Sequence, residues 1–280
     1  MRTRRRLEVW AAALHVGLAT LPREPILGLK RAILPVSYWR AAEFAYALDR
    51  LALPPGSFLF DLGSPKDLAA ILARERGYRI VATDILDQAV ELSRRYATAQ
   101  GLDGDGAGRV QSVRQDGRGL DYPDHTFDAA FSISVLEHIP HAGDSAAVRE
   151  LMRVVKPGGL VVGTVPYDRR YRETFVEGAV YERQAIAGEK LFFERHYDGP
   201  SLRDRLLEAS GAELIDLEIW GERAVRTERL LTRAGRIRDL FAPFEALLSI
   251  CFLDRLETEE SGHPMAAFFT LRKTRQWVSG

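Results

Sequence analysis

The chain has 280 residues, of which 46% are hydrophobic and 28% charged, a composition typical of soluble globular proteins rather than disordered or fibrous ones. Basic and acidic residues number 39 each, so no overall field draws the chain to nucleic acid or an anionic membrane. Such a partner would need a local patch. The single cysteine, Cys251, cannot form an internal disulfide; it fits a reducing cytoplasm and excludes a cysteine-based zinc site. We expect no metal centre.

The N-terminus superficially resembles a signal peptide, because four arginines in the first six residues precede an alanine-rich stretch at residues 10–21. However, Glu8 and His15 interrupt the apolar run, and Pro22-Arg23-Glu24 is a poor cleavage site. No stretch reaches the roughly 18 uninterrupted apolar residues of a membrane span. We therefore expect residues 1–56 to form a helical N-terminal arm of a cytoplasmic protein, without stable membrane insertion.

Residues 57–165 alternate short apolar runs with amphipathic helical stretches. The runs predict five buried strands, at residues 58–60, 79–82, 110–113, 127–133 and 160–165. Apolar residues at helical spacing also predict a helix at 38–51 and one before each of Gly77 and Gly101. This alternation indicates βαβ units, so we expect a parallel sheet whose ligand sites lie at the carboxyl ends of its strands.

The pattern after residue 165 is weaker. Residues 166–200 are charged and aromatic without clear periodicity, and we expect them to form a lid or substrate segment. The segment 222–260 has apolar residues at helical spacing and is expected to be a helical insertion. The remaining predicted elements are a helix at 201–209 and strands at 213–220 and 266–271.

No internal repeat or low-complexity linker divides the chain. We therefore expect residues 1–280 to form one domain, in which residues 57–165 are the core and residues 201–280 complete the sheet.

The segment from Asp61 to Asp67, Asp-Leu-Gly-Ser-Pro-Lys-Asp, lies where the first strand turns into its helix. Gly63 permits a tight turn and close approach of a ligand to the backbone, while Ser64 and Asp67 form a Ser-x-x-Asp helix-capping pattern. Such a turn directs free backbone amides at a carboxylate or phosphate, and Asp61 can accept a hydrogen bond from an ammonium group. Taken alone, the segment is equally compatible with an ordinary capped turn.

Two further acids stand at the ends of the next two strands. Asp84 follows Asp61 by 23 residues, a position from which a carboxylate can accept both hydroxyls of a ribose. Asp116 ends the third strand, where a carboxylate could accept an exocyclic adenine amine. Crowded carboxylates repel one another and are costly to desolvate, so these three acids indicate a nucleoside site more than a structural device.

At this point the chain resembles the class I S-adenosylmethionine-dependent methyltransferases. Asp61-Leu62-Gly63 is similar to the family's glycine-rich loop, Asp84 to its ribose acid and Asp116 to its adenine-side acid. Residues 127–139, FDAAFSISVLEHI, resemble the family's fourth strand and the turn after it. Residues 150–160, ELMRVVKPGGL, resemble the helix and Pro-Gly-Gly turn before its fifth strand.

The resemblance implies a Rossmann-like doubly wound α/β fold with a seven-stranded, mostly parallel sheet, an antiparallel last strand and S-adenosyl-L-methionine as cofactor. In the family's pattern Ile85 flanks the adenine, Gly117 lies beside it and Ser132 offers backbone contacts near the methionine end. Tyr38 or Trp39, in the helix before the core, could close over the cofactor; packing on the sheet is the alternative for both.

The loop departs from the family at two positions. The family's glycines two and four residues beyond Gly63 are replaced here by Pro65 and Asp67. Proline removes an amide and stiffens the turn, which puts the grip on the methionine end of the cofactor in doubt.

A sulfonium methyl group is already electrophilic, so the protein mainly has to align the acceptor and exclude water. An alcohol or phenol acceptor also has to lose a proton. His138, beyond the fourth strand, is the first candidate base, since an ordinary pKa near 6.5 suits proton transfer at neutral pH. His196, in the expected lid, is the second candidate.

The acceptor site is expected between the N-terminal arm and residues 166–200. Tyr167, Arg170 and Tyr197 are candidate contacts to an aromatic or anionic small molecule, through stacking and charge. A solvated charged loop is the alternative. The helices of 222–260 could form a dimer face, a lipid-facing cover or the wall of the pocket.

The sequence thus predicts a methyltransferase that acts on a small molecule, with oxygen as the expected acceptor atom and nitrogen or carbon as alternatives. The altered loop also leaves open a cofactor-binding protein of the same fold without methyltransferase activity. A nicotinamide-dependent oxidoreductase is disfavoured because the Gly-x-Gly-x-x-Gly fingerprint is absent. Zero net charge and the lack of an appended RNA-binding module argue against a nucleic-acid partner.

Overall fold

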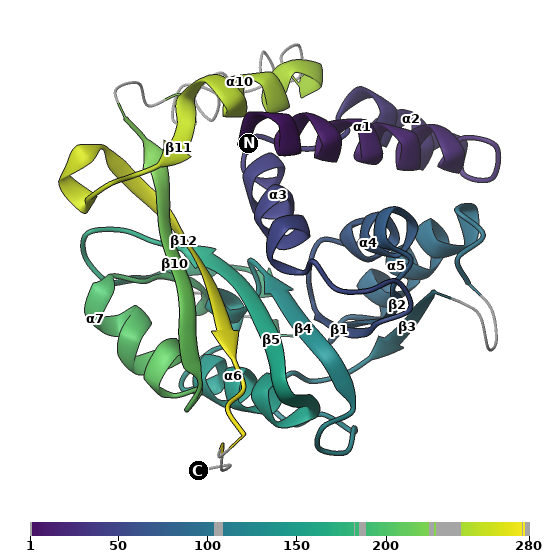
Figure 1. The fold of residues 1–280 in the computed structure, drawn as a ribbon. Coiled ribbons are helices and arrows are strands. Elements are labelled where there is room, and N and C mark those ends of the chain that lie inside the picture. Colours follow the sequence, from purple (N-terminus) through teal and green to yellow (C-terminus); the bar gives the residue numbers. More distant parts are fainter. Residues whose placement is uncertain are drawn as a thin grey trace.

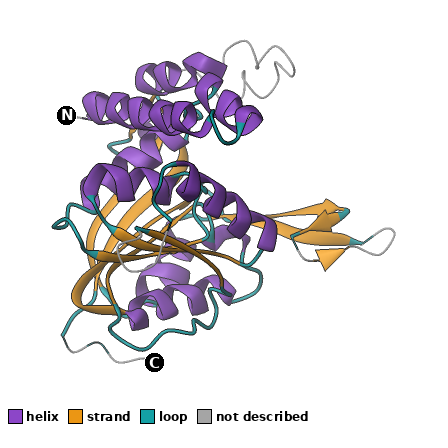
Figure 2. Ribbon diagram, turned by 90° about the vertical axis from the view of Figure 1, so that its right-hand side faces the viewer, coloured by secondary structure: helices purple, strands orange, loops and turns teal. Residues whose placement is uncertain are grey.

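The computed structural model describes residues 2–103, 109–181, 183–184, 189–223, 227, 242–275 and 277. A large twisted sheet crosses the molecule, and helices cover both of its faces (Figures 1 and 2). Among the residues described, none of the helices combines the length and apolar character that a membrane span requires.

The central sheet has eight strands in the order β11-β10-β12-β5-β4-β1-β2-β3. Their bounds are β1 (Phe58–Leu62), β2 (Arg79–Asp84), β3 (Val110–Arg114), β4 (Phe127–Ile133), β5 (Val155–Pro166), β10 (Glu213–Glu222), β11 (Leu253–Arg255) and β12 (His263–Arg272). Strands β1 to β5 are parallel, and β12 runs antiparallel to both of its neighbours, β5 and β10. The predicted doubly wound, mostly parallel sheet with an antiparallel last strand is therefore confirmed.

The predicted number of seven strands is one too few. All seven predicted strands are present, and β11 adds an eighth by pairing antiparallel with the end of β10. This strand lies inside residues 222–260, where we expected helices. The three residues of β11 follow a helix directly and are too few to show an alternation of apolar and polar side chains. The spacing of apolar residues therefore cannot reveal this strand.

The helices follow the predicted alternation. The N-terminal arm consists of α1 (Arg2–Thr20), α2 (Pro25–Ile33) and α3 (Arg40–Arg50), and the crossovers are α4 (Leu68–Arg76), α5 (Asp87–Ala99) and α6 (Gly143–Val154). The predicted helix at 201–209 is present as α7 (Gly199–Leu202) continued by a π-helical turn, Arg203–Glu208. Single turns lie at η1 (Leu136–His138), η4 (Ala242–Phe244) and η5 (Glu259–Ser261).

The insertion at 222–260 is described only in part. Its second predicted helix is present as α10 (Glu245–Phe252). The first, predicted from apolar residues between 230 and 241, lies outside the described residues.

Two apolar clusters lie on opposite faces of the sheet and use alternate residues of each strand. In β1, Leu59 belongs to the cluster with α1, α3 and α4, whereas Phe60 and Leu62 belong to the cluster with α6 and α7. This division follows from the two-residue period of a strand. Because both faces are covered, the open positions for a ligand are at the ends of the strands.

The segment after β5 is a hairpin, which the sequence did not reveal. Strands β6 (Arg172–Glu177) and β9 (Lys190–His196) pair antiparallel and extend beyond the helical layers (Figure 2). Two short strands, β7 (Ala179–Val180) and β8 (Arg183–Gln184), also pair. β6 is exposed or half-buried along its whole length, so it lacks the buried apolar alternation by which strands are recognised.

A buried ion pair anchors this hairpin to the core. The Arg195 guanidinium of β9 lies 2.5 Å from the carboxylate of Asp144 at the start of α6, and both side chains are fully buried. Tyr197 donates a hydrogen bond to the same carboxylate at 2.9 Å. Breaking such a pair leaves an uncompensated buried charge, so the base of the hairpin is held firmly against α6.

Candidate functional site

A cavity of about 340 Å³ lies where the strand order reverses between β1 and β4. We call it the switch-point cavity. Its lining comes from the ends of β1, β2, β3 and β4 and from the turns that follow them: Leu62, Gly63, Asp84, Ile85, Gln115, Asp116, Gly117, Arg118, Ser134, Val135, His138, Ile139, Pro140 and Tyr181. This cavity brings together five predicted cofactor-binding residues, Gly63, Asp84, Ile85, Asp116 and Gly117, and the candidate base His138.

At two glycine positions in this wall, a Cβ atom would be too close to a neighbouring side chain. A Cβ on Gly63 would lie 2.8 Å from a methyl carbon of Val135, and the φ angle of +68° is also unfavourable for other residues. A Cβ on Gly117 would lie 2.8 Å from a methyl carbon of Leu62. Both positions thus bring bare backbone up to the cavity.

Asp84 is held from two sides. One carboxylate oxygen accepts a hydrogen bond from the Leu86 amide at 2.9 Å, and the other lies 2.5 Å from the ammonium group of Lys66. Lys66 also donates to the Gly63 carbonyl at 3.0 Å. Each carboxylate oxygen has a second lone pair, so Asp84 can still accept hydrogen bonds from a ligand.

Asp116 forms an ion pair with Arg118 at 2.6 Å. Hydrogen bonds from the Arg118 side chain hold the pKa of this half-exposed carboxyl below its ordinary value. Asp116 is therefore ionised at neutral pH, and Arg118 compensates its negative charge.

The loop after β1 does not form the predicted capped turn. Helix α4 begins at Leu68 and has no side-chain cap, and the Ser64 hydroxyl accepts from the Ile133 amide at 3.0 Å instead of capping it. The amide of Gly63 donates to the Thr83 carbonyl, and that of Ser64 donates to Asp61. Proline at position 65 has no amide, so the loop offers a ligand fewer free donors than we expected.

Asp61 lies behind the cavity wall. Its side chain is almost fully buried and accepts from the Ser64 amide at 3.1 Å. Burial raises the pKa of this carboxyl to about 7, although the Lys66 charge acts in the opposite direction. Asp61 therefore stabilises the turn through its hydrogen bond with Ser64, in addition to any contact that it makes with a ligand.

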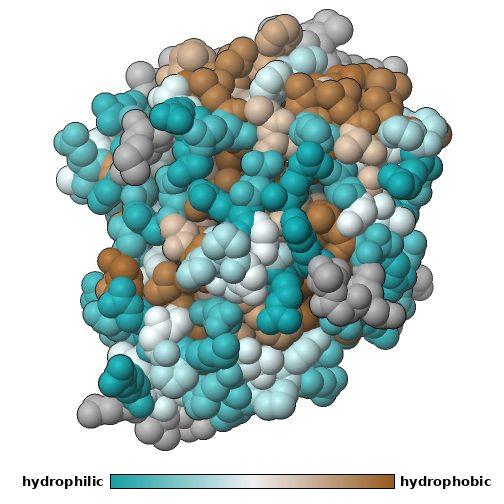
Figure 3. Space-filling model, turned by 45° about the vertical axis from the view of Figure 1, so that its right-hand side comes forward, coloured by the Kyte–Doolittle hydropathy of each residue, from teal (hydrophilic) through white to brown (hydrophobic). Residues whose placement is uncertain are grey.

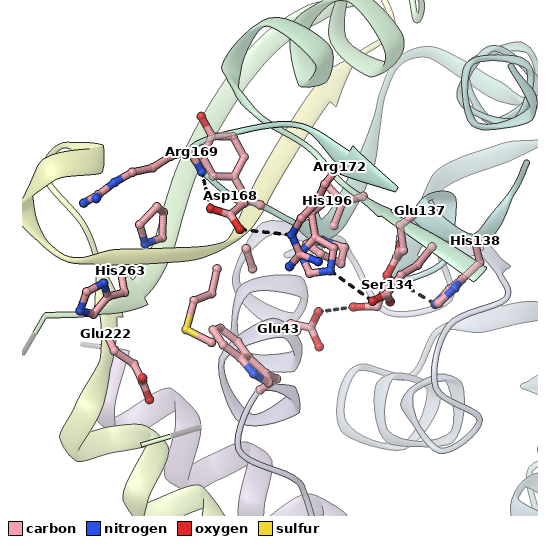
Figure 4. A pocket seen from close by; sticks show the side chains of 18 of the residues that line it. Glu43, Ser134, Glu137, His138, Asp168, Arg169, Arg172, His196, Glu222 and His263 are labelled. Carbon is pink, nitrogen blue, oxygen red and sulfur yellow. Dashed lines mark hydrogen bonds and ion pairs between the residues drawn. The ribbon is translucent and has the colours of Figure 1, made fainter. Parts of the chain in front are cut away.

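A second and larger cavity, of about 690 Å³, lies beside the first. We call it the lid cavity, because Arg172 of β6 and Glu194 and His196 of β9 form one of its sides. Figure 4 shows His138, Glu137, Ser134 and Glu43 on one side of it and Glu222 and His263 on the opposite side. Of the three predicted acceptor contacts only Tyr167 lines this cavity, and both candidate bases, His138 and His196, line it as well.

Ser134 and His138 line both cavities and therefore mark their junction. Ser134 follows β4 directly and has a φ angle of +52°, in the left-handed region that non-glycine residues rarely adopt. Its hydroxyl donates to Glu43 at 2.6 Å, and its amide donates to the Thr164 carbonyl at 3.0 Å. These bonds fix the strained backbone at the point where the two cavities meet.

The hydrogen bonding of His138 defines its tautomer. Nδ1 lies 2.9 Å from the carbonyl oxygen of Phe193, and a carbonyl only accepts, so Nδ1 carries the proton. Nε2 therefore carries the lone pair; the nearest carboxylate oxygen, on Glu137, is 3.8 Å away. Burial lowers the pKa of His138, so the ring is neutral at pH 7.

His196, in contrast to His138, has no ring nitrogen with an unengaged lone pair. Its Nδ1 lies 3.0 Å from a guanidinium nitrogen of Arg172, which only donates, so Nδ1 is the acceptor. Nε2 then carries the proton and donates to Glu194 at 3.2 Å. Both nitrogens of His196 are engaged.

Three buried carboxylates of the lid cavity escaped the sequence analysis. Glu43 of α3 accepts hydrogen bonds from Ser134 and Thr164 and pairs with Arg40 at 2.5 Å. Glu137 is 1% exposed, one of its oxygens has no hydrogen-bond partner among the described residues, and burial raises its pKa well above the ordinary value. Glu222 accepts from the Tyr38 hydroxyl at 2.6 Å. Glu137 was visible beside His138, but no local signal marks the other two.

Six predicted site residues lie outside both cavities: Asp61 and Ser64, described above, and Tyr38, Ser132, Arg170 and Tyr197. Tyr38 is buried against Glu222, so it packs the arm on the sheet and does not cover a ligand. Tyr197 is fully buried against Asp144, and Arg170 is exposed to solvent. Ser132 is buried with its hydroxyl on the Leu62 carbonyl at 3.2 Å. Trp39, the alternative to Tyr38, lines the lid cavity.

No group of three or more histidine, cysteine, aspartate or glutamate side chains among the described residues is arranged to hold a metal ion.

Comparisons with known proteins agree with this geometry. Residues 60–163 match the family model of the methyltransferase domain. Over 116 residues the chain is 33% identical to the sterol 24-C-methyltransferase of Yarrowia lipolytica, covering 41% of this chain and 29% of that protein. It is 30% identical over 117 residues to the ubiquinone/menaquinone biosynthesis C-methyltransferase UbiE of Pseudomonas putida, covering 41% and 43%. These matches span less than half the length of each relative.

Among solved structures, the [4+2]-cyclase SpnF is similar over 85% of this chain and 83% of its own, with a TM-score of 0.56 and 25% identity. The residues matched by the family model contain β2 to β4, most of β1 and β5, and every lining residue of the switch-point cavity except Tyr181. Residues 60–163, the core of this chain, are thus similar to the methyltransferase domain, as the strand-end motifs predict.

Proposed function

We propose that this protein is an S-adenosylmethionine-dependent methyltransferase that acts on an oxygen atom of a small-molecule acceptor. The observation that carries the proposal is the place and tautomer of His138, which lies at the junction of the two cavities with the lone pair on Nε2. Since the family's motifs assign the switch-point cavity to the cofactor, the lid cavity is left for the acceptor.

The residues of the switch-point cavity fit this cofactor. Bare backbone lines the cavity at Gly63 and Gly117, and a Cβ at either position would displace Val135 or Leu62, which line it too. Asp84 would accept the ribose hydroxyls, and Asp116 with Ile85 would bind the adenine. Because few free amides lie around Pro65, other groups would have to bind the methionine end of the cofactor. We propose Asp61 and the backbone near Ser132 for this role.

S-adenosylmethionine, when bound, supplies an electrophilic methyl group. His138 Nε2 would accept the proton of the acceptor hydroxyl as the methyl group passes from sulfur to that oxygen, which would leave S-adenosylhomocysteine as the second product. His196 is disfavoured as the base because both of its nitrogens are engaged, and we assign it with Tyr167 to acceptor binding. The hairpin and the arm would exclude water from the junction.

Carbon methylation is the second candidate, and the names of the matched relatives favour it: both are C-methyltransferases. A third candidate is a protein of this fold that does not methylate. The altered loop supports it, and so does the similar solved structure that is named as a [4+2]-cyclase.

We further infer a single cytoplasmic domain without a nucleic-acid partner. The lid cavity draws lining residues from all four segments of the chain: Ser37 from the arm, Ser134 from the core, His196 from the hairpin and His263 from the C-terminal part. Segments that build one cavity are expected to fold and act together.

The test is calorimetric titration of the purified protein with S-adenosylhomocysteine, with NAD as the control ligand. Binding in the micromolar range, with none for NAD, supports the cofactor assignment. Methyl transfer from isotopically labelled S-adenosylmethionine to a panel of phenols and alcohols, read by mass spectrometry, then tests oxygen methylation. Labelled product at carbon alone would favour the second candidate, and binding with no transfer to oxygen, nitrogen or carbon acceptors would favour the third.

Lys66 is expected to strengthen cofactor binding by positioning Asp84. Replacing Lys66 by methionine keeps the length of the side chain but removes the ion pair at 2.5 Å and the bond to the Gly63 carbonyl. Because a half-buried pair of this kind contributes on the order of 1 kcal/mol, we expect S-adenosylhomocysteine to bind about fivefold more weakly. Lys66→Arg should restore most of the affinity.

Lys156→Met is the matched control. It also breaks a lysine–aspartate pair, with Asp128 at 2.7 Å, but neither residue lines a cavity. The control should leave the dissociation constant within about twofold of the native value. Equal affinities for Lys66→Met and Lys156→Met would show that Asp84 does not need Lys66.

A further inference from the structure

The outer side of α2 presents an apolar face to solvent. Ile26, Leu29 and Ile33 follow one another at helical spacing and are 82%, 55% and 48% exposed. Leu18 of α1, 51% exposed, extends the same end of the molecule. Large apolar side chains gathered on one helical face are unusual on the surface of a soluble monomer.

The packing of α2 on α1 explains why these side chains point outward. Gly28 lies on the inner side of α2, and a Cβ there would be 2.5 Å from the backbone nitrogen of Leu21. Gly17 of α1 meets α2 in the same way, with 2.7 Å to the nitrogen of Ala32. The two helices therefore approach backbone to backbone, which turns the large residues of α2 away from the contact.

The same hairpin of helices is strongly basic. Residues 2–33 contain seven arginines and lysines against two glutamates, a net charge of +5 in a chain whose total is zero. Part of this charge is not free at the surface, because Arg6 is buried, Arg5 pairs with Asp49 and Arg31 pairs with Asp67. Arg23 and Lys30 are exposed beside the apolar side chains.

We propose that this apolar, basic face of α1 and α2 docks on the surface of an anionic lipid membrane. Apolar side chains flanked by lysine and arginine bind at the headgroup boundary, where the first are buried and the second attract anionic lipid. A second copy of the chain fits less well, because the exposed Arg23 and Lys30 of one copy would repel those of the other. Nucleic acid would use the charge but leave the isoleucines and leucines exposed.

The docking face lies close to the lid cavity, so docking would have a consequence for acceptor binding. Helix α2 ends at Ile33, and Ser37, Trp39 and Arg40, which follow within seven residues, line the lid cavity. Apolar areas lie on the part of the surface where α1, α2 and α10 are found (Figures 1 and 3). Docking would bring the acceptor side of the protein close to the bilayer, where amphipathic acceptors gather.

Vesicle sedimentation tests the proposal with the full-length protein. Vesicles of phosphatidylcholine with 30% phosphatidylglycerol, at about 0.1 M salt, should bind at least tenfold more protein than vesicles of phosphatidylcholine alone. Raising the salt to about 1 M should remove most of this preference, because the Debye length falls from about 10 Å to 3 Å. The triple variant Ile26→Ser/Leu29→Ser/Ile33→Ser, and separately Lys30→Glu with Arg23→Glu, should each lose at least tenfold in binding.

Leu214→Ser/Ile215→Ser is the matched control, since it removes two exposed apolar side chains of β10 at 44% and 38% exposure. It should bind vesicles like the native protein. Binding that does not depend on lipid charge, or a triple variant that binds as the native protein does, would overturn the proposal. A dimer in light scattering that the triple variant turns into a monomer, without vesicle binding, would assign the face to a second copy instead.

Discussion

Replacing Asp84 by alanine should weaken binding of S-adenosylhomocysteine by at least about 100-fold, or roughly 2.7 kcal/mol. Asp84 lies at the end of β2 on the wall of the switch-point cavity, and both of its oxygens keep a lone pair for a ligand. Two hydrogen bonds from ribose hydroxyls to a carboxylate contribute about 1.5–3 kcal/mol each, so their joint loss accounts for the expected effect. Calorimetry at pH 7.5 measures it directly.

Two further variants make this result specific. Asp84→Asn preserves the shape and one acceptor oxygen, so it should lose about tenfold. Asp87→Ala removes an acid three residues along the chain whose side chain is 84% exposed and lies outside the cavity, and it should bind as the native protein does. If Asp84→Ala has native affinity and a native melting temperature, the ribose does not lie against β2, and the cofactor assignment of the cavity fails.

The grouping of residues in the switch-point cavity, which we propose for the cofactor, could be predicted from the sequence because these residues lie at strand ends. Each apolar run marks a buried strand, and parallel strands of a doubly wound sheet bring their carboxyl ends to one edge. Gly63, Asp84 and Asp116 are scattered over more than fifty residues of sequence, yet they line one cavity for this reason. The motif order alone was therefore enough to place them together.

The acceptor half could not be predicted in the same way. Glu43, Glu222 and His263 come from α3, β10 and β12, and only long-range packing makes them neighbours. The hairpin of β6 and β9 carries charged residues on both sides, so it lacks a strand's apolar alternation. Tyr38 and Tyr197 have the chemistry of binding residues, but the fold uses their hydroxyls to satisfy the buried carboxylates Glu222 and Asp144.

The loop after β1 shows how a departure from a family pattern can be absorbed locally. Pro65 removes an amide, and the remaining turn is held by Asp61 and by the Ser64 hydroxyl. Lys66, which the sequence analysis passed over, joins Gly63 to Asp84. A positive charge between Asp61 and Asp84 offsets the repulsion that we expected among the strand-end acids.

Replacing His138 by asparagine should lower kcat for methylation of a phenolic or alcoholic acceptor by about 100-fold to 10,000-fold, the range typical of a lost general base. Asparagine can keep the hydrogen bond from the Nδ1 position to the Phe193 carbonyl, but it has no group at the position of Nε2. Binding of S-adenosylhomocysteine should stay within about threefold, because Asp84 and the glycines are untouched. His141→Asn is the matched control and should keep native kcat, since His141 lines neither cavity and asparagine tolerates its φ angle of +58°.

The pH profile separates a base from a merely structural histidine. Burial lowers the pKa of His138 below its ordinary value near 6.5, and only the neutral ring can accept the acceptor's proton. The rate should therefore be constant from about pH 6.5 upward through neutrality and should fall as the pH drops through the lowered pKa. In His138→Asn this acid limb should vanish from whatever rate remains. A variant that keeps native kcat, or that keeps the same acid limb, would show that His138 holds the Phe193 carbonyl without moving a proton, and the oxygen-methylation mechanism would need a different base.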